Sequence, residues 1–174
     1  MTRTVRYAGA DVTVLPQSDG EELREHAQGI ERTPRKAPHK ALTLLDVARR
    51  ELGVRSASAP RCVDGKCGAC RLLVDGELVN ACAVLWENVR DGATIEAYET
   101  LADDEAATRA IDAFAEERPT RCRLCIGGLG VTAVSLARAG KQGDPDAIEA
   151  ALITATCMCT GRGSLRRALL AKPR

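Results

Sequence analysis

The stretch CVDGKCGAC, residues 62–70, places three cysteines in one short loop, and Cys82 follows after eleven intervening residues. The glycine and alanine residues of this stretch let the backbone wrap closely around a bound group. The N–H groups of such a loop can then point at sulfur atoms that carry negative charge. The stretch therefore predicts a tight loop that holds a metal or a metal cluster.

Four more cysteines follow a cysteine-free segment of about forty residues. They form two pairs, Cys122-x2-Cys125 and Cys157-x-Cys159, which a long gap separates. Each group of four thiols can complete one metal site by itself. The spacing therefore predicts two separate sites.

Composition excludes several classes of protein. The chain has 174 residues, with 25 Lys and Arg against 24 Asp and Glu, so it lacks the basic excess of a nucleic-acid binder. It has no apolar run of about 18 residues to span a membrane, and its first residues lack the apolar segment of a secretory signal. We therefore expect a cytoplasmic protein with no nucleic-acid partner, whose cysteines stay out of disulfides in a reducing compartment.

Four cysteines fit either tetrahedral zinc or an iron–sulfur cluster. The first group has the spacing of plant-type [2Fe–2S] proteins, whereas structural zinc usually takes two similar C-x2–4-C pairs. In the second group each pair precedes a predicted helix, whose positive N-terminal end favours a negatively charged cluster. We therefore predict two [2Fe–2S] clusters, with a zinc-stabilised interaction module as an alternative. The eight predicted ligands are Cys62, Cys67, Cys70, Cys82, Cys122, Cys125, Cys157 and Cys159.

The predicted secondary structure changes near residue 99, from strands and turns to helices. Before it, turn signals predict hairpins over 4–15 and 71–79 and a strand over 94–97, with one helix between a capping box at Thr43 and a stop at Gly53. A charged insertion at about 16–42 is interpreted as a solvated loop or as a docking arm for a partner.

After residue 99 the apolar residues recur at helical spacing, and glycine or proline interrupts them. The predicted helical stripes cover 107–114, 129–137, 145–155 and 165–169. The pattern predicts an α+β chain with two domains, residues 1–99 and 100–174.

These motifs together resemble the small iron–sulfur subunit of the molybdenum hydroxylases, the xanthine dehydrogenase, aldehyde oxidoreductase and carbon monoxide dehydrogenase family. CVDGKCGAC, then VDG at 74–76 and VNAC at 79–82, is similar to the family's first motif, and CMCTG at 157–161 is similar to its last. The resemblance covers the chain outside the insertion. It implies a plant-type ferredoxin-like (β-grasp) N-terminal domain and a C-terminal four-helix [2Fe–2S]-binding domain.

The resemblance also implies a function. The chain would be a non-catalytic electron-relay subunit, without catalytic residues of its own. It would pass electrons from a molybdenum–pterin centre in a large subunit, through its second and then its first cluster, to FAD in a further subunit or to another acceptor. Such subunits would form a heterotrimer or its dimer.

One motif departs from the family pattern. RCRLCIGG, residues 121–128, stands where the family usually has Gln-Cys-Gly-Tyr-Cys-Thr-Pro-Gly, and Met158 replaces a common Arg. In relatives this neighbourhood faces the pterin cofactor, so a relay for a flavin-dependent or other non-molybdenum oxidoreductase is the alternative function. Arg121 and Arg123 are hypothesised to raise the potential of the second cluster or to bind a pterin phosphate. Pairing with acidic groups of a partner is the simpler alternative.

Overall fold

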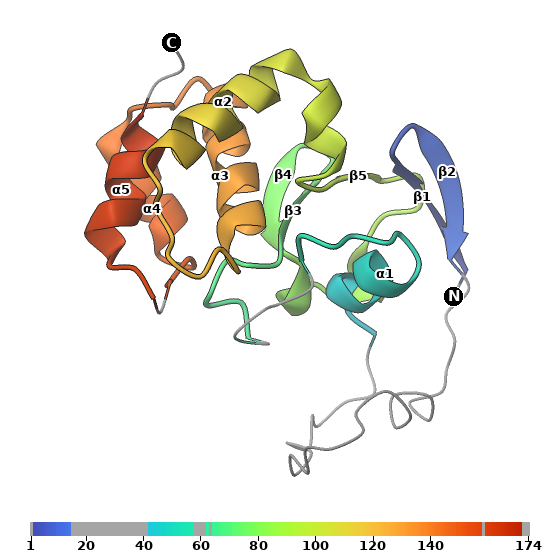
Figure 1. The fold of residues 1–174 in the computed structure, drawn as a ribbon. Coiled ribbons are helices and arrows are strands. Elements are labelled where there is room, and N and C mark those ends of the chain that lie inside the picture. The colour runs from blue at the N-terminus through green and yellow to red at the C-terminus, as the bar shows by residue number, and fades with distance from the viewer. Residues whose placement is uncertain (1, 15–41, 58–61, 63, 158, 172–174) are drawn as a thin grey trace, which may run out of the picture.

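The computed structural model describes residues 2–14, 42–57, 62, 64–157 and 159–171. Almost all of the predicted charged insertion lies outside these residues, as does Met158. The described part of the chain forms a mixed α/β structure in which five strands make one sheet, in the order β2-β1-β5-β3-β4 (Figure 1). The strands are β1 (Arg3–Tyr7), β2 (Ala10–Val14), β3 (Arg71–Val74), β4 (Glu77–Asn80) and β5 (Thr94–Glu96).

Both predicted hairpins are present. β1 and β2 pair antiparallel and so do β3 and β4, while β5 runs parallel to β1 and antiparallel to β3. Asp75 and Gly76, at the tip of the second hairpin, have φ angles of 50° and 83°. Two successive positive φ angles are those of a type I′ turn, whose twist matches the strands that it joins.

The first helix, α1 (Leu44–Arg50), begins as the sequence predicts. The Thr43 hydroxyl accepts a hydrogen bond from the Asp46 N–H, and the Asp46 carboxylate accepts one from the Thr43 N–H. The predicted end next to Gly53 was wrong, because α1 ends at Arg50. Residues 51–54 unwind through a left-handed Gly53 instead, and the Val54 N–H closes the turn on the Ala48 carbonyl.

Four helices follow residue 104 and match the four predicted stripes. They are α2 (Glu105–Glu116), α3 (Ile126–Arg138), α4 (Pro145–Leu152) and α5 (Arg162–Leu170). The third is shorter than predicted, since it stops at Leu152 and leaves Ala155 beyond its end. Three short 3₁₀ turns complete the described elements: η2 (Ala81–Ala83), η3 (Trp86–Asn88) and η4 (Thr100–Asp103).

The strand β3 is buried on both faces, because successive side chains point to opposite sides of a sheet. Leu72 packs into the apolar cluster around α1, whereas Leu73 packs with Val131 and Val134 of α3. Figure 1 shows α2, α3, α4 and α5 grouped beside the sheet, with α3 next to β3. A side chain at position 71 lies on the same face as Leu73 and therefore points toward α3.

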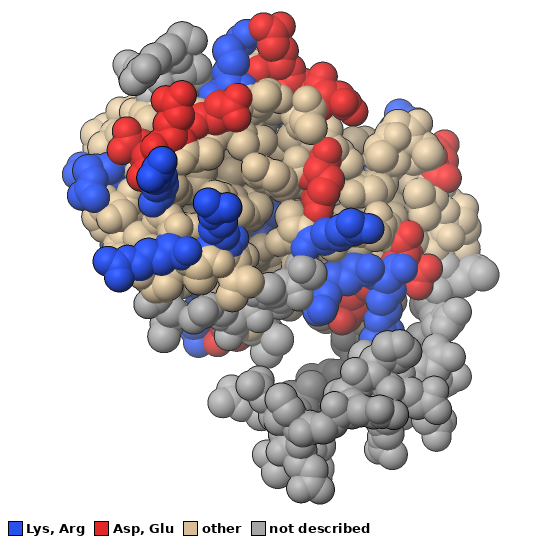
Figure 2. All heavy atoms as spheres, viewed as in Figure 1, with Lys and Arg blue, Asp and Glu red and all other residues tan. Residues whose placement is uncertain are grey.

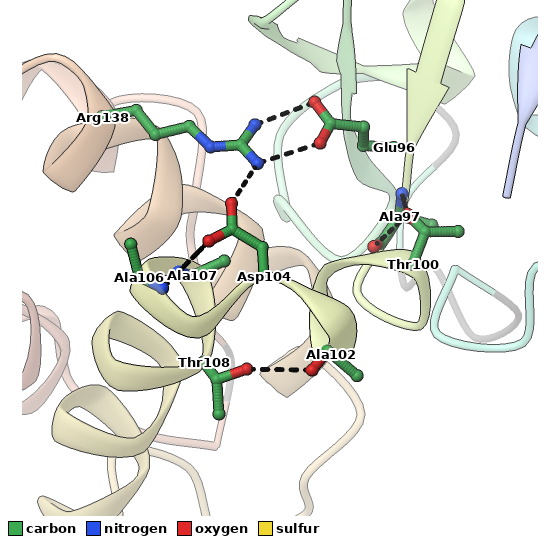
Figure 3. Close-up of polar contacts among 9 residues, drawn as sticks. All are labelled: Glu96, Ala97, Thr100, Ala102, Asp104, Ala106, Ala107, Thr108 and Arg138. Carbon is green, nitrogen blue, oxygen red and sulfur yellow. Dashed lines mark hydrogen bonds and ion pairs between the residues drawn. The ribbon is translucent and has the colours of Figure 1, made fainter. Parts of the chain in front are cut away.

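A polar contact on the surface joins α3 to the sheet (Figure 3). The guanidinium of Arg138 donates to both carboxylate oxygens of Glu96, at 2.9 and 3.0 Å, and to Asp104 at 2.8 Å. Asp104 is also the N-cap of α2, where it accepts from the N–H groups of Ala106 and Ala107. One arginine thus connects β5, α2 and α3.

Across the parts of the chain that the structure describes, every helix is too short or too polar to cross a membrane.

Candidate metal centres

The first cysteine group lies on the loop before β3 and in η2 after β4. Its loop backbone points N–H groups at sulfur: those of Lys66 and Cys67 donate to the Cys62 sulfur, at 3.2 and 3.1 Å. The N–H of Gly65 donates to the Cys82 sulfur at 3.3 Å. Such N–H···S bonds are typical of sites where a thiolate carries shared negative charge.

The β3–β4 hairpin brings the fourth cysteine of this group back to the loop. Cys82 follows the end of β4, and the Ala81 N–H donates to the Cys70 carbonyl at 3.2 Å. The side-chain amide of Asn80 donates to the Gly65 carbonyl at 3.0 Å. A hydrogen bond between the two thiols lowers the pKa of Cys70 and raises that of Cys82. These two sulfurs therefore form one pair.

The second group is assembled from two distant segments. Cys125 is the N-cap of α3, with Cys122 just before it, while Cys157 and Cys159 lie between α4 and α5. The Cys159 sulfur lies 3.2 Å from that of Cys122 and 3.4 Å from that of Cys157. Burial raises the pKa of Cys125 to about 12. A backbone hydrogen bond at Cys122 lowers the pKa of Cys159 to about 6.

Each group therefore brings cysteine sulfurs close together, and a [2Fe–2S] cluster is held by four cysteine thiolates. Within the described residues, no three or more His, Cys, Asp or Glu side chains are arranged as they stand to hold a metal ion. The donor set and the N–H groups directed at sulfur fit a two-iron cluster in the first group. The crowded sulfurs of the second group fit the same chemistry.

The two groups, predicted as separate sites, lie against each other. Cys67, Cys125 and Cys157 belong to one buried cluster of side chains. The Thr156 N–H donates to the Lys66 carbonyl at 3.0 Å, which joins the backbones of the two groups next to their cysteines.

Glycine permits this close approach. A Cβ atom on Gly128, in the first turn of α3, would overlap the carbonyl oxygen of Gly68 in the first loop. Only a residue without a side chain allows the two backbones to pack at this distance.

The sequence reasoning missed Arg71, which directly follows Cys70 and is only 3% exposed. Its guanidinium donates to the Asn80 side chain at 3.4 Å and to the Thr132 hydroxyl at 2.8 Å. It also donates to the Ala151 carbonyl at 2.5 Å and to the Thr154 hydroxyl at 2.9 Å. One side chain thus connects β4, α3 and the segment that leads to Cys157.

A sequence signal for Arg71 exists: a charged residue opens the otherwise apolar strand RLLV directly after a predicted ligand. Burial lowers the pKa of Arg71 to about 10, whereas the nearby charges of Cys70 and Cys67 act in the opposite direction. Among the described residues, no carboxylate forms an ion pair with it.

The two arginines singled out from the sequence, Arg121 and Arg123, are exposed and line a pocket of about 610 Å³. Arg118 and Thr120 line the same pocket, and the buried Thr120 hydroxyl has no hydrogen-bond partner in the described structure. Arg118 and Arg123 have positive φ angles of 45° and 59°, an uncommon conformation for residues with a side chain. Figure 2 shows Lys and Arg side chains gathered over the segment between α2 and α3 and over the neighbouring helices.

No protein-family model matches the chain. It is 34% identical over 124 residues to a probable xanthine dehydrogenase subunit of Bacillus subtilis strain 168, a match that covers 71% of this chain and 70% of that protein. It is 30% identical over 118 residues to the nicotinate dehydrogenase small FeS subunit of Eubacterium barkeri, a match that covers 68% of this chain and 74% of that protein.

Solved structures share the fold. Quinoline 2-oxidoreductase from Pseudomonas putida 86 matches with a TM-score of 0.69 at 22% identity, over 98% of this chain and 90% of that chain. The aldehyde oxidoreductase from Desulfovibrio desulfuricans gives the same TM-score at 22% identity. The match covers 98% of this chain but spans only 16% of that much longer protein.

These relatives define a class, the iron–sulfur subunits of oxidoreductase complexes. The chain belongs to the molybdenum hydroxylase family, as a small iron–sulfur subunit of the xanthine dehydrogenase and aldehyde oxidoreductase type. The family predicted from the cysteine motifs is thereby confirmed.

Proposed function

We propose that this chain is an electron-transfer subunit that carries two [2Fe–2S] clusters between a molybdenum–pterin catalytic subunit and FAD or another acceptor. The proposal rests on the contact between the two cysteine groups. Cys67 and Cys157 share one buried cluster, and the bond between Thr156 and Lys66 joins their backbones. Each cluster, when bound, supplies a one-electron redox centre. Two such centres in contact form a continuous path through the chain.

In this proposal the first cluster is held by Cys62, Cys67, Cys70 and Cys82, within a ferredoxin-like domain of residues 1–99. The N–H groups that point at the Cys62 and Cys82 sulfurs stabilise the negative charge that reduction adds. No proton needs to be moved by a side chain of this subunit, which is why the chain needs no catalytic residue.

The second cluster is held by Cys122, Cys125, Cys157 and Cys159, within a four-helix domain of residues 100–174. In the second group Cys122 is exposed and Cys159 is partly exposed, whereas in the first group Cys62 alone is partly exposed and the other three cysteines are buried. The exposed side of the second group supports an entry point for electrons from the catalytic subunit. The electrons then pass to the first cluster and on to the FAD subunit, in a heterotrimer or its dimer.

The pocket lined by Arg118, Arg121 and Arg123 supports the proposal that a partner binds next to the second cysteine group. In the described structure the guanidinium groups of Arg118, Arg121 and Arg123 form no ion pair. Leu124 beside them is one of the exposed large apolar side chains of the described structure, at 41% exposure. We propose that Arg121 and Arg123 bind an anionic group of the catalytic partner, either a cofactor phosphate or a carboxylate.

The sequence around Cys122 and Cys125 favours a second candidate function. The stretch at 121–128 keeps both cysteines but has none of the other residues usual around them, apart from the final glycine. A relay for a flavin-dependent or other non-molybdenum oxidoreductase would keep both clusters and change the surface toward its partner in this way.

Metal analysis of the native complex tests both candidates. We expect brown protein with about four irons and about four acid-labile sulfides per chain, and two distinguishable EPR signals on reduction. Molybdenum and a pterin in the co-purified complex select the first candidate, and flavin without molybdenum selects the second. Zinc in place of iron would contradict both and select the zinc-stabilised module.

A further inference from the structure

The buried guanidinium of Arg71 has hydrogen-bond partners but no counter-charge in the described structure. Its four acceptors, on Asn80, Thr132, Ala151 and Thr154, are all neutral. Neutral acceptors satisfy N–H groups, but they do not compensate for the removal of a full positive charge from water. A cation at 3% exposure therefore requires a nearby anion that the described carboxylates do not provide.

Cysteines of the first group lie close to Arg71, and their thiols become thiolates when they hold a cluster. Cys70 is its neighbour in the chain, and the charges of Cys70 and Cys67 both act on it. Its partner Thr154 lies three residues before Cys157. Its partner Thr132 lies on α3, the helix that Cys125 caps. Arg71 therefore lies between the first group and the segments that carry the second.

Building on the proposed function, we propose that Arg71 is a fixed positive charge that raises the reduction potentials of both clusters, the first more than the second. Reduction adds one negative charge to a cluster, and a positive charge close by stabilises the product. Because Arg71 is buried, its field acts through protein interior and is poorly screened by water and salt. The cluster in turn supplies the counter-charge that the buried guanidinium lacks.

A purely structural role for Arg71 is the competing explanation, and Arg138 provides the matched control. Arg138 also connects α3 to the sheet, through two hydrogen bonds to Glu96 of β5, and it donates a third to Asp104, the N-cap of α2 (Figure 3). Its charge, however, is balanced by the carboxylates of Glu96 and Asp104, and its side chain is 38% exposed. Loss of Arg138 therefore removes another connection between α3 and the sheet without removing an uncompensated buried charge.

The test compares Arg71→Gln, Arg71→Lys and Arg138→Gln in the full chain loaded with clusters. EPR-monitored redox titration gives the midpoint potential of each cluster, and thermal unfolding gives stability. We expect Arg71→Gln to lower the midpoint potential of the first cluster by at least about 59 mV, which corresponds to a tenfold change in the equilibrium constant of one-electron reduction. The second cluster should shift in the same direction by less. Arg71→Lys should keep potentials near those of the wild type, and Arg138→Gln should lower the unfolding temperature with unchanged potentials.

Two results would overturn the proposal: wild-type potentials in a cluster-loaded Arg71→Gln protein, or a potential in Arg71→Lys that falls although the charge is kept. The second result remains decisive if Arg71→Gln does not fold. A wild-type chain that binds no iron would instead refute the proposed function, so the two failures are distinguishable.

Discussion

The two cysteine groups are assembled by different means. In the first group, Cys67, Cys70 and Cys82 are buried, and the N–H groups directed at sulfur come from the loop itself. In the second group, Cys122 is exposed, and its sulfur meets that of Cys159, which is 37 positions away in the chain. The first group is thus built by a local loop and one hairpin, whereas the second is built by the packing of helices.

An electron relay needs both a cluster that is shielded from water and a cluster that a partner can approach, and the two groups differ in these properties. A cluster held by the first group would be the better shielded from water, because three of its four cysteines are buried and Cys62 is only partly exposed. A cluster held at the meeting point of two segments, with one exposed ligand, is open to a partner at its surface. The following predictions test this contrast, from the largest expected effect to the smallest.

Removal of one ligand from each group should abolish one cluster and spare the other. We expect Cys62→Ala and Cys122→Ala each to lose about half of the bound iron, because each group completes its own site. Iron analysis with EPR of the reduced proteins should show one remaining signal in each variant, and the two signals should differ. Loss of all iron in either variant would mean that the groups do not act as independent sites.

The contact between the groups should be sensitive to a single methyl group. Gly128→Ala would drive a Cβ atom into the Gly68 carbonyl and should cost about 1–3 kcal/mol of unfolding free energy. Denaturant unfolding measures the loss. Gly163→Ala in α5 is the control, since the added Cβ finds only the flexible end of Arg167 at 4.0 Å. Equal stability of the two variants would contradict the close packing of the groups.

Exposure should make the second cluster more labile than the first. We expect an iron chelator to remove iron in two phases, the faster one several times quicker and assigned to the second group through Cys122 and Cys159. Absorbance and EPR followed over time measure both phases, with Cys122→Ala as the control that lacks the fast phase. A single phase, or faster loss of iron from the first group, would contradict the predicted difference in lability between the two clusters.

The exposed arginines should affect only the second cluster, and weakly. Replacement of Arg121 by Gln and Arg123 by Gly should lower its midpoint potential by less than about 59 mV, because exposed charges are screened by water and salt. The shift should shrink as ionic strength rises, which redox titration at two salt concentrations measures. An unchanged potential at low salt would leave these arginines without an electrostatic role toward the cluster.

The smallest expected effect concerns the surface contact that fastens α3 to the sheet. Hydrogen bonds from Arg138, then from backbone N–H groups, lower the pKa of Asp104 below its usual 3.8. A carboxyl with a lowered folded pKa adds stability above the unfolded pKa, and this stability is lost as pH falls through the folded pKa. The advantage of the wild type over Asp104→Asn, below about 1 kcal/mol, should therefore vanish in acid. Urea unfolding at neutral and acid pH measures it, and a constant difference would contradict the assignment.

Local signals in the sequence predicted much of the fold because they act over a few residues. The capping box at Thr43, the hairpin at Asp75-Gly76 and the proline that opens α4 are all present. The end of α1 was missed, because the chain unwinds before Gly53 and closes its turn on the Ala48 carbonyl.

The sequence by itself determined the eight thiols, their division into two groups and the family to which the chain belongs, since ligand spacing and turn chemistry are local properties. Only the tertiary structure decided that the groups touch, that Gly128 permits this contact, and that Arg71 is buried between the first group and the segments that carry the second. The physical reason is that a buried charge and a close backbone contact depend on segments that meet only after folding. In the sequence, Arg71 is only a charged residue at the start of an apolar strand, and its burial follows from the contacts with α3 and the end of α4.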